Sequence, residues 1–116
     1  MQHANYVQTL KDLGLEVMEL EADEKYPDSC FVEDNALMTP NCIIVANPGA
    51  PTRKGEIENM LPVLKQFHDN VEFITDPGTC EPGDIMMVDK HFYIGQSDRT
   101  NKLGAEQMIA HLEKHG

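Results

Sequence analysis

The sequence repeats a pattern of apolar residues at an interval of about fifty positions, and this repeat constrains the fold more than any other feature. Segment 33–38 (EDNALM) lies fifty residues before 83–88 (GDIMMV), and the same shift carries 42–45 (CIIV) onto 92–95 (FYIG). Two helical stripes coincide at a shift of forty-eight residues: Met60, Leu61 and Leu64 match Met108, Ile109 and Leu112. Such repeats are typical of propeller-like arrays, whose units bury their faces only against neighbouring units.

Each copy predicts two strands joined by a turn and followed by a helix. Turn signals lie at Thr39-Pro40-Asn41 and at Asp89-Lys90. Pro62 lies inside the first helical pattern and predicts a kink or a break there. The predicted elements are strands at 31–38, 42–45 and 71–74 with a helix at 55–67, then strands at 84–88 and 91–95 with a helix at 101–115.

The chain before the first copy predicts one helix and one strand. Apolar residues recur at helical spacing over residues 4–13, Gly14 follows as a helix end, and residues 15–20 alternate apolar and acidic side chains. We therefore expect one α/β structural domain over residues 1–116. Its three parts are a helix–strand end of an incomplete unit at 1–21, a complete ββαβ unit at 22–76, and a ββα unit without its last strand at 77–116.

The charge of the chain excludes several classes of partner. Twenty acids stand against nine Lys and Arg residues, which gives a net charge of −11. There is no basic stripe to neutralise phosphates or anionic lipids, so we expect neither a nucleic acid nor a membrane partner. No long apolar run predicts a transmembrane span or a signal peptide. The acidity is compatible with a cationic small ligand, and it also serves solubility.

The three cysteines Cys30, Cys42 and Cys80 are odd in number, widely spaced and without a C-x-x-C pair. This pattern is typical of reduced thiols in a cytoplasmic protein. His111 and His115 lie four residues apart near the end of a predicted helix, where they favour interaction with the helix dipole over metal binding. We expect no metal site and no cofactor.

Residues 26–34 (YPDSCFVED) place acids among apolar residues. Asp28, Glu33 and Asp34 fall within seven positions, with Phe31 and Val32 between them. Carboxylates are rarely buried unless they are paired, so the segment is either a solvated turn or the wall of a pocket that holds a cation. A guanidinium has five N–H donors and no acceptor, so several carboxylates suit it well.

The only two arginines, Arg53 and Arg99, each follow the second strand of one copy. Arginine is preferred over lysine where a planar carboxylate is held through two hydrogen bonds. Each of them could also form a surface ion pair.

Four blocks of the chain resemble the dimethylarginine dimethylaminohydrolases, which belong to the amidinotransferase/arginine deiminase superfamily. The blocks span residues 26–105 and read Y-P-D-S-C-F-V-E-D, N-P-G-A-P-T-R-K-G-E, G-T-C-E-P-G-D-I-M-M-V and F-Y-I-G-Q-S-D-R-T-N-K-L-G-A. The resemblance implies a five-bladed α/β propeller (the pentein fold). This chain would be a partial propeller of about two ββαβ units with a preceding helix–strand.

The resemblance also implies a role for seven residues in binding an arginine-like ligand and in catalysis. Asp28, Glu33 and Asp34 would hold the guanidinium, and Phe31 would stack on its plane in a cation–π contact. Arg53 and Arg99 would grip the ligand's carboxylate. Glu81 would orient the catalytic histidine.

In the family, a cysteine attacks the guanidinium carbon and a histidine protonates the leaving amine. No cysteine or histidine of this chain matches those two positions, and the acid next to Cys80 would raise rather than lower the pKa of that thiol. We therefore expect a half-length, truncated relative that is inactive alone. Two alternatives stay open: a binding module for arginine-like ligands, and one half of an enzyme completed by another chain.

An open fragment of a propeller leaves strand edges unpaired and apolar helix faces uncovered. We therefore expect a homo-oligomer, most simply a two-fold dimer that covers the missing neighbours.

Overall fold

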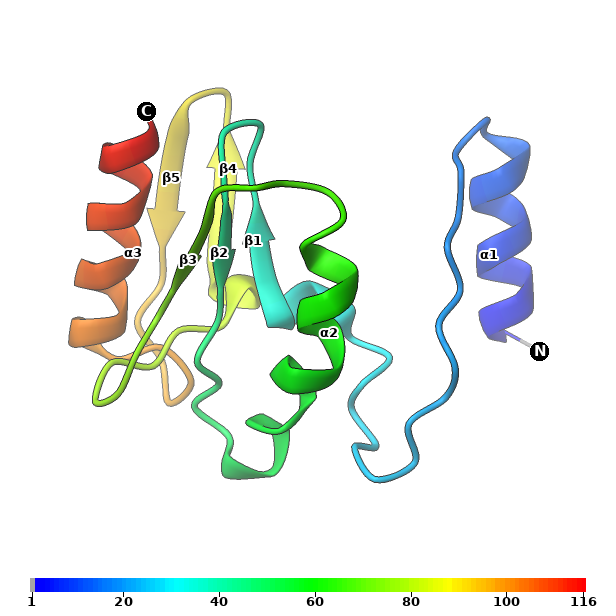
Figure 1. Cartoon of the computed structure of the whole chain (residues 1–116), viewed down its shortest axis with the longest axis horizontal. Coiled ribbons are helices and arrows are strands. Elements are labelled where there is room, and N and C mark those ends of the chain that lie inside the picture. Colours follow the sequence, from blue (N-terminus) through cyan, green and yellow to red (C-terminus); the bar gives the residue numbers. More distant parts are fainter. Residues whose placement is uncertain (1) are drawn as a thin grey trace.

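The computed structural model describes residues 2–116. Its centre is a three-stranded sheet of β1 (Ala36–Met38), β2 (Ile43–Val45) and β3 (Val71–Phe73), in the order β1-β2-β3. β1 runs antiparallel to β2, and β3 runs parallel to β2. The parallel pair is joined by α2 (Glu56–Leu64), which crosses over one face of the sheet (Figure 1).

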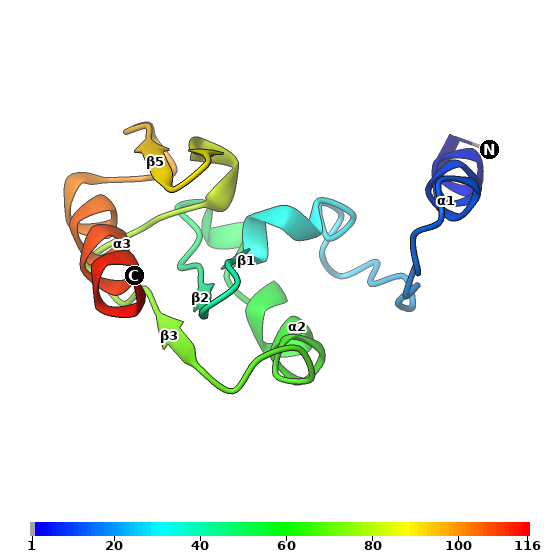
Figure 2. The same cartoon turned by 90° about the horizontal axis from the view of Figure 1, so that it is seen from above.

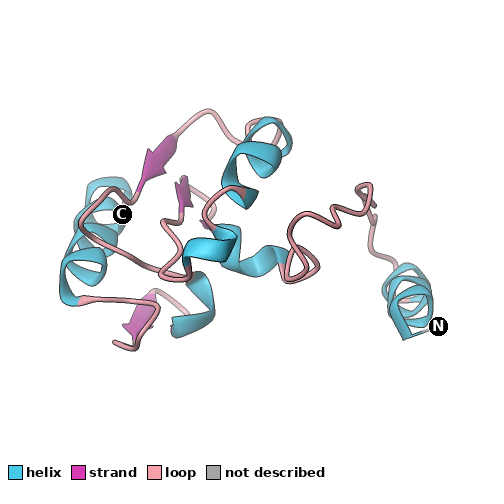
Figure 3. Cartoon of the chain, turned by 90° about the horizontal axis from the view of Figure 1, so that it is seen from below, coloured by secondary structure: helices cyan, strands magenta, loops and turns pink. Residues whose placement is uncertain are grey.

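The central strand β2 explains why both faces of this sheet are covered. Its side chains alternate: Ile43 and Val45 pack with Leu64 of α2, whereas Ile44 packs on the opposite face with Met108. Met108 belongs to α3 (Lys102–His115). Each buried aliphatic side chain stabilises the fold by about 1.5–3 kcal/mol. A continuous apolar strand therefore requires a layer on each side, and Figure 3 shows helices on both sides of the strands.

The second sheet is a hairpin of β4 (Ile85–Val88) and β5 (His91–Ile94), followed by α3. Ile85 and Ile94 lie opposite each other and pack against the same core cluster as Met108. The side chain of Asn101 caps α3 by accepting a hydrogen bond from the Gly104 N–H at 2.8 Å. Over residues 2–116 the chain is a mixed α/β domain with three α-helices and two small sheets.

The N-terminal arm, residues 2–22, stands apart from the rest of the chain (Figures 1 and 2), and Asp23 joins it to α2 by accepting a hydrogen bond from Asn59 at 2.6 Å. It consists of α1 (Gln2–Asp12) and an extended segment, and Val7 is the one residue of α1 that is buried. The strand predicted at 15–20 is wrong, because this segment forms no strand and pairs with no other strand in the described residues. Its Leu15 and Met18 side chains are exposed to solvent.

Three predicted boundaries also differ from the structure. Residues Val32–Asn35 form a 3₁₀ helix (η1) instead of the start of a strand. Asn35 bonds back to the Val32 carbonyl within it, and Asp34 bonds to Arg53 and to the Gly83 N–H. Likewise, Pro82–Asp84 form a 3₁₀ helix (η3) before β4. The helix predicted at 55–67 is shorter than expected. It continues without a break through Pro62, which lies in its last turn.

Candidate functional site

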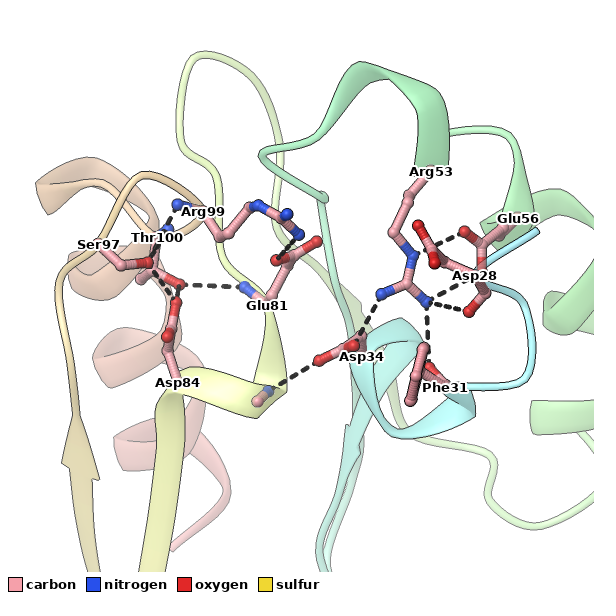
Figure 4. Close-up of polar contacts among 11 residues, drawn as sticks. Asp28, Phe31, Asp34, Arg53, Glu56, Glu81, Asp84, Ser97, Arg99 and Thr100 are labelled. Carbon is pink, nitrogen blue, oxygen red and sulfur yellow. Dashed lines mark hydrogen bonds and ion pairs between the residues drawn. The ribbon is translucent and has the colours of Figure 1, made fainter. Parts of the chain in front are cut away.

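The candidate site lies on the loops at one end of both sheets (Figure 4). η1 precedes β1, η3 precedes β4, and a third 3₁₀ helix, η2 (Pro51–Arg53), follows β2. Because β1 and β2 are antiparallel, the start of β1 and the end of β2 meet at the same end of the sheet. The turn at 96–100, after β5, brings Arg99 to this end of the hairpin.

Arg53 is buried, with 5% of its surface exposed. Its Nε donates to Glu56 Oε2 at 2.7 Å, and its Nη1 donates to Asp34 Oδ2 at 2.7 Å. Its Nη2 donates to Glu56 Oε1 at 3.1 Å and to the backbone carbonyls of Asp28 and Phe31 at 3.0 and 3.1 Å. These bonds leave one Nη1 hydrogen for any further acceptor.

The electrostatics of Arg53 follow from these contacts. The hydrogen bond to Glu56 raises the pKa of Arg53 above its ordinary value, and Asp34 raises it further, while burial acts in the opposite direction. The guanidinium is therefore held permanently charged between two carboxylates. The structure places this arginine inside the protein, bound by the chain's own acids.

Asp34 also connects the two copies of the repeat. Its second oxygen, Oδ1, accepts a hydrogen bond from the backbone N–H of Gly83 at 3.2 Å. A Cβ atom at position 83 would lie 2.6 Å from this oxygen, so the contact depends on glycine. Both oxygens of Asp34 are thus engaged within the protein.

Glu81 and Arg99 form the second ion pair of the site. Arg99 Nη1 donates to Glu81 Oε2 at 3.3 Å. Glu81 is buried, with 5% of its surface exposed, whereas 52% of the Arg99 side chain is exposed. The other oxygen, Glu81 Oε1, is buried and has no hydrogen-bond donor within residues 2–116. An unpaired buried carboxylate oxygen is costly, so Oε1 is the acceptor of this site that most needs a hydrogen-bond donor.

Arg99 also lies close to the loop that follows β2. A Cβ atom at Gly49 would lie 2.6 Å from the Arg99 Cα atom, so glycine is required for this approach. The loops that carry the two arginines are therefore in contact, although the arginines have different surroundings.

The remaining predicted residues, Asp28, Phe31 and Glu33, have exposed surfaces. Phe31 is 56% exposed. Asp28 and Phe31 contribute backbone carbonyls to Arg53, but their side chains face solvent and are free to meet a ligand.

Sequence reasoning missed four polar residues that build the site. Glu56 is buried and binds Arg53 through both carboxylate oxygens. Asp84, Ser97 and Thr100 form a hydrogen-bonded group beside Glu81 and Arg99. The R-x-x-E spacing of Arg53 and Glu56 at a helix start was a usable signal, because residues three apart lie on one helical face.

The three cysteines differ in burial. Cys42 and Cys80 are buried, and Cys30 is exposed. The pKa of the Cys80 thiol is raised to about 11, mainly by burial and in addition by the nearby Asp84 and Glu81 carboxylates. The direction is the one expected for a thiol beside an acid, and it disfavours a nucleophilic role.

Two histidines of α3 contact Glu72 of β3 instead of the candidate site. His115 Nε2 lies 2.9 Å from Glu72 Oε1, and His111 Nδ1 lies 3.5 Å from Glu72 Oε2. Within residues 2–116, no group of three His, Cys, Asp or Glu side chains is arranged to hold a metal ion. Among the helices described, none is long and apolar enough to cross a bilayer.

Two surface hollows lie elsewhere on the molecule. One of about 360 Å³ is lined by residues between 65 and 73, and one of about 300 Å³ lies between the turn of β1–β2, the turn of β4–β5 and the end of α3. Neither is lined by a residue predicted to bind ligand.

Comparison with known proteins identifies relatives of this chain. A sequence model described as "N,N dimethylarginine dimethylhydrolase, eukaryotic" matches residues 1–115. The N(G),N(G)-dimethylarginine dimethylaminohydrolase of Pseudomonas aeruginosa is 51% identical over 99% of this chain and 46% of its own length. The protein of the same name from Streptomyces coelicolor is 32% identical over 96% of this chain and 43% of its own. The chain thus spans about half the length of these curated relatives.

Solved structures agree with the sequence comparison. The P. aeruginosa enzyme in complex with citrulline has a TM-score of 0.97 at 51% identity, over 99% of this chain and 46% of that one. The N-terminal domain of a cyanobacterial arginine dihydrolase has a TM-score of 0.86 at 16% identity, over 97% of this chain and 42% of that one, which shows a shared fold alone. From the family match and the 51% identity, the chain belongs to the dimethylarginine dimethylaminohydrolase family.

Proposed function

We propose that residues 1–116 form the ligand-holding half of a guanidine C–N hydrolase site, and that this chain alone binds an arginine-like ligand without hydrolysing it. The observation that carries the proposal is the buried, unpaired Oε1 of Glu81 beside the half-exposed Arg99. In hydrolysis by this family's chemistry, a histidine N–H would meet that oxygen. A cysteine thiolate would attack the guanidinium carbon.

The ligand would lie between the exposed acids and Arg99. Asp28 and Glu33 supply carboxylates to its guanidinium, and Phe31 supplies an exposed ring to its face. Arg99 has donors left for the ligand's carboxylate, because the bond to Glu81 is the only hydrogen bond that its side chain donates within the described residues. Asp34 and Arg53 would act mainly by holding in place the segment that carries Asp28, Phe31 and Glu33. One N–H hydrogen of Arg53 would be left to reach the ligand.

This proposal is supported by relatives that act on or bind such molecules. The P. aeruginosa relative carries the name of a dimethylarginine dimethylaminohydrolase, and its solved structures include a complex with citrulline. At 51% identity, the bound citrulline supports an arginine-like ligand for this chain.

Two assays test the proposal. Calorimetric titration with L-arginine is expected to give binding heats for the wild-type chain that Arg99→Ala abolishes. Lys54→Ala, which removes the same charge from an exposed ion pair with Asp76, should keep them. Incubation with dimethylarginine should yield no citrulline. Equal heats for wild type and Arg99→Ala would exclude the carboxylate-binding role, and citrulline formed by the pure chain would exclude the inactive state.

A second candidate is an active enzyme completed by another chain. The unpaired Glu81 Oε1 favours this candidate, because a donor from a partner would satisfy it. Citrulline that appears only when cell lysate is added to the pure chain would support completion. No citrulline under either condition would leave the binding module.

We also propose that the chain associates with itself in a two-fold dimer in the cytoplasm, as a partial propeller with units at residues 22–76 and 77–116. The exposed apolar side chains of the detached arm, Leu13, Leu15, Met18 and Leu20, support association. Three free thiols support a reducing compartment. Light scattering should report twice the 13.0 kDa mass of the chain, and a monomer at micromolar concentration would contradict the dimer.

A further inference from the structure

The Asp84 carboxylate joins the two segments that carry Glu81 and Arg99. Its Oδ2 accepts a hydrogen bond from Ser97 Oγ at 2.7 Å and a second from Thr100 Oγ1 at 2.6 Å (Figure 4). Both are short bonds to a charged acceptor, which is the stronger class of hydrogen bond. Asp84 ends η3, whereas Ser97 and Thr100 lie in the turn after β5, so the carboxylate fastens two separate stretches of chain.

Thr100 links the Asp84 carboxylate to the backbone of Glu81. Thr100 is fully buried, and its Oγ1 accepts the backbone N–H of Glu81 at 3.1 Å. A hydroxyl can donate one hydrogen bond, and the Thr100 hydroxyl donates it to the Asp84 carboxylate, which can only accept. The lone pairs of Thr100 Oγ1 are therefore turned toward the Glu81 amide. The charged Asp84 carboxylate therefore fixes which atom donates in the Thr100–Asp84 and Glu81–Thr100 hydrogen bonds.

Ser97 links the same carboxylate to the backbone of Arg99. Its Oγ donates to Asp84 and accepts the backbone N–H groups of Arg99 at 3.0 Å and of Thr100 at 3.3 Å. The Ser97 N–H also bonds to the Thr100 carbonyl at 2.9 Å, which closes the turn. The backbone of Arg99 is thus set by the carboxylate that also sets Glu81.

We propose that Asp84, Thr100 and Ser97 are positioning residues that hold Glu81 and Arg99 in fixed register, so that Glu81 Oε1 stays buried and unpaired while Arg99 points its free donors at a ligand. This inference rests on the proposed role of Glu81 and Arg99 in binding. None of the three residues needs to touch the ligand. Their effect passes through the two backbone segments that they connect.

The test compares Thr100→Val with Thr100→Ser. Valine keeps the shape but removes the hydroxyl, whereas serine keeps the hydroxyl and removes a methyl group. Thr39→Val is the matched control, because the Thr39 hydroxyl accepts the N–H groups of Asn41 and Cys42 in the β1–β2 turn at the far end of the sheet. Urea unfolding gives the stability of each variant. NMR of the Arg99 Nε–H group reports, without any ligand, on the guanidinium whose Nη1 pairs with Glu81.

Thr100→Val is expected to shift the Arg99 Nε–H signal and to weaken arginine binding at least tenfold, although the Thr100 hydroxyl bonds to Asp84 and to the Glu81 N–H and not to the Arg99 side chain. Thr100→Ser should keep both the Arg99 signal and the arginine affinity of the wild type. Thr39→Val should lower the stability of the fold and change neither the Arg99 signal nor the arginine affinity. A wild-type Arg99 signal in Thr100→Val, or an equal shift in Thr39→Val, would overturn the proposal.

Ser97→Ala keeps the inference testable if Thr100→Val does not fold, since Ser97 is exposed. It should also shift the Arg99 signal, and an unchanged signal would overturn the proposal. If the wild type binds no arginine, the proposed function fails. The ligand-free Arg99 signal still decides whether the three residues position this arginine.

Discussion

Asp34 binds Arg53 through one carboxylate oxygen, at 2.7 Å, with both side chains largely removed from solvent. Its other oxygen holds the Gly83 N–H of the next repeat. Asp34 and Arg53, which the sequence both predicts as ligand-binding residues, are thus bound to each other. The acidic wall that faces solvent is consequently narrower than the sequence predicts, and it consists of Asp28 and Glu33 with Phe31 between them.

Arg53→Ala is expected to destabilise the fold by about 3 kcal/mol, because it leaves the buried Glu56 and the half-buried Asp34 carboxylates without their charged partner. Arg53→Lys should restore little of this, since an ammonium cannot form the paired bonds to Glu56. Urea unfolding followed by circular dichroism measures the change.

The control for this prediction is Lys54→Ala. Lys54 pairs with the exposed Asp76, so its loss should cost no more than about 1 kcal/mol. Equal unfolding free energies for Arg53→Ala and the wild type would show that the Arg53 cluster contributes nothing to stability.

Glu72 makes stability depend on pH at low pH. Hydrogen bonds from Lys114 and His115 lower the pKa of Glu72 from 4.5 to about 2. Because the folded-state pKa lies below the unfolded one, this contribution is fully present above about pH 4.5 and is lost as the pH falls toward 2. Thermal unfolding midpoints measured between pH 6 and pH 2.5 should fall across this window.

Glu72→Gln should lower the midpoint at pH 6 and flatten its dependence on pH below 4.5, whereas Glu113→Gln on the exposed surface of α3 should behave as the wild type. An identical pH dependence in the wild type and Glu72→Gln would refute the assignment of this acid.

The three thiols should differ in reactivity. At pH 8, iodoacetamide should modify the exposed Cys30 and spare Cys42 and Cys80, because both are buried and the pKa of Cys80 is raised to about 11. Mass spectrometry of the peptides checks this pattern. Adding urea should expose all three, and rapid modification of Cys80 in the folded chain would contradict its burial.

The sequence predicted the hairpins and the crossover helix because their signals are local. The turn at Thr39-Pro40-Asn41 sits between β1 and β2, Asp89-Lys90 sits between β4 and β5, and the stripe of α2 packs on the sheet. The strand predicted at 15–20 does not form, because a strand needs a neighbouring strand to pair with. The alternation of apolar and acidic residues within one segment does not provide that neighbour.

The site was predicted less completely than the fold. Residue types pointed to carboxylates and arginines, but the sequence does not show which donors are already taken. Arg53 differs from Arg99 because Glu56 follows three residues later and Asp34 folds back from η1. Thr100 carries no sequence signal, since its role arises from a contact with Asp84 across sixteen residues.

The most direct test of the account is an NMR titration of the folded chain with L-arginine that follows the backbone amide signals. We predict that the largest changes map to Asp28, Phe31, Glu33 and Arg99, and that the amides around Glu72, which is bound by Lys114, His111 and His115, do not move. Saturable changes centred on Glu72, or no change up to millimolar arginine, would contradict the central claim that this chain holds a guanidine ligand at the Glu81–Arg99 end of its sheets.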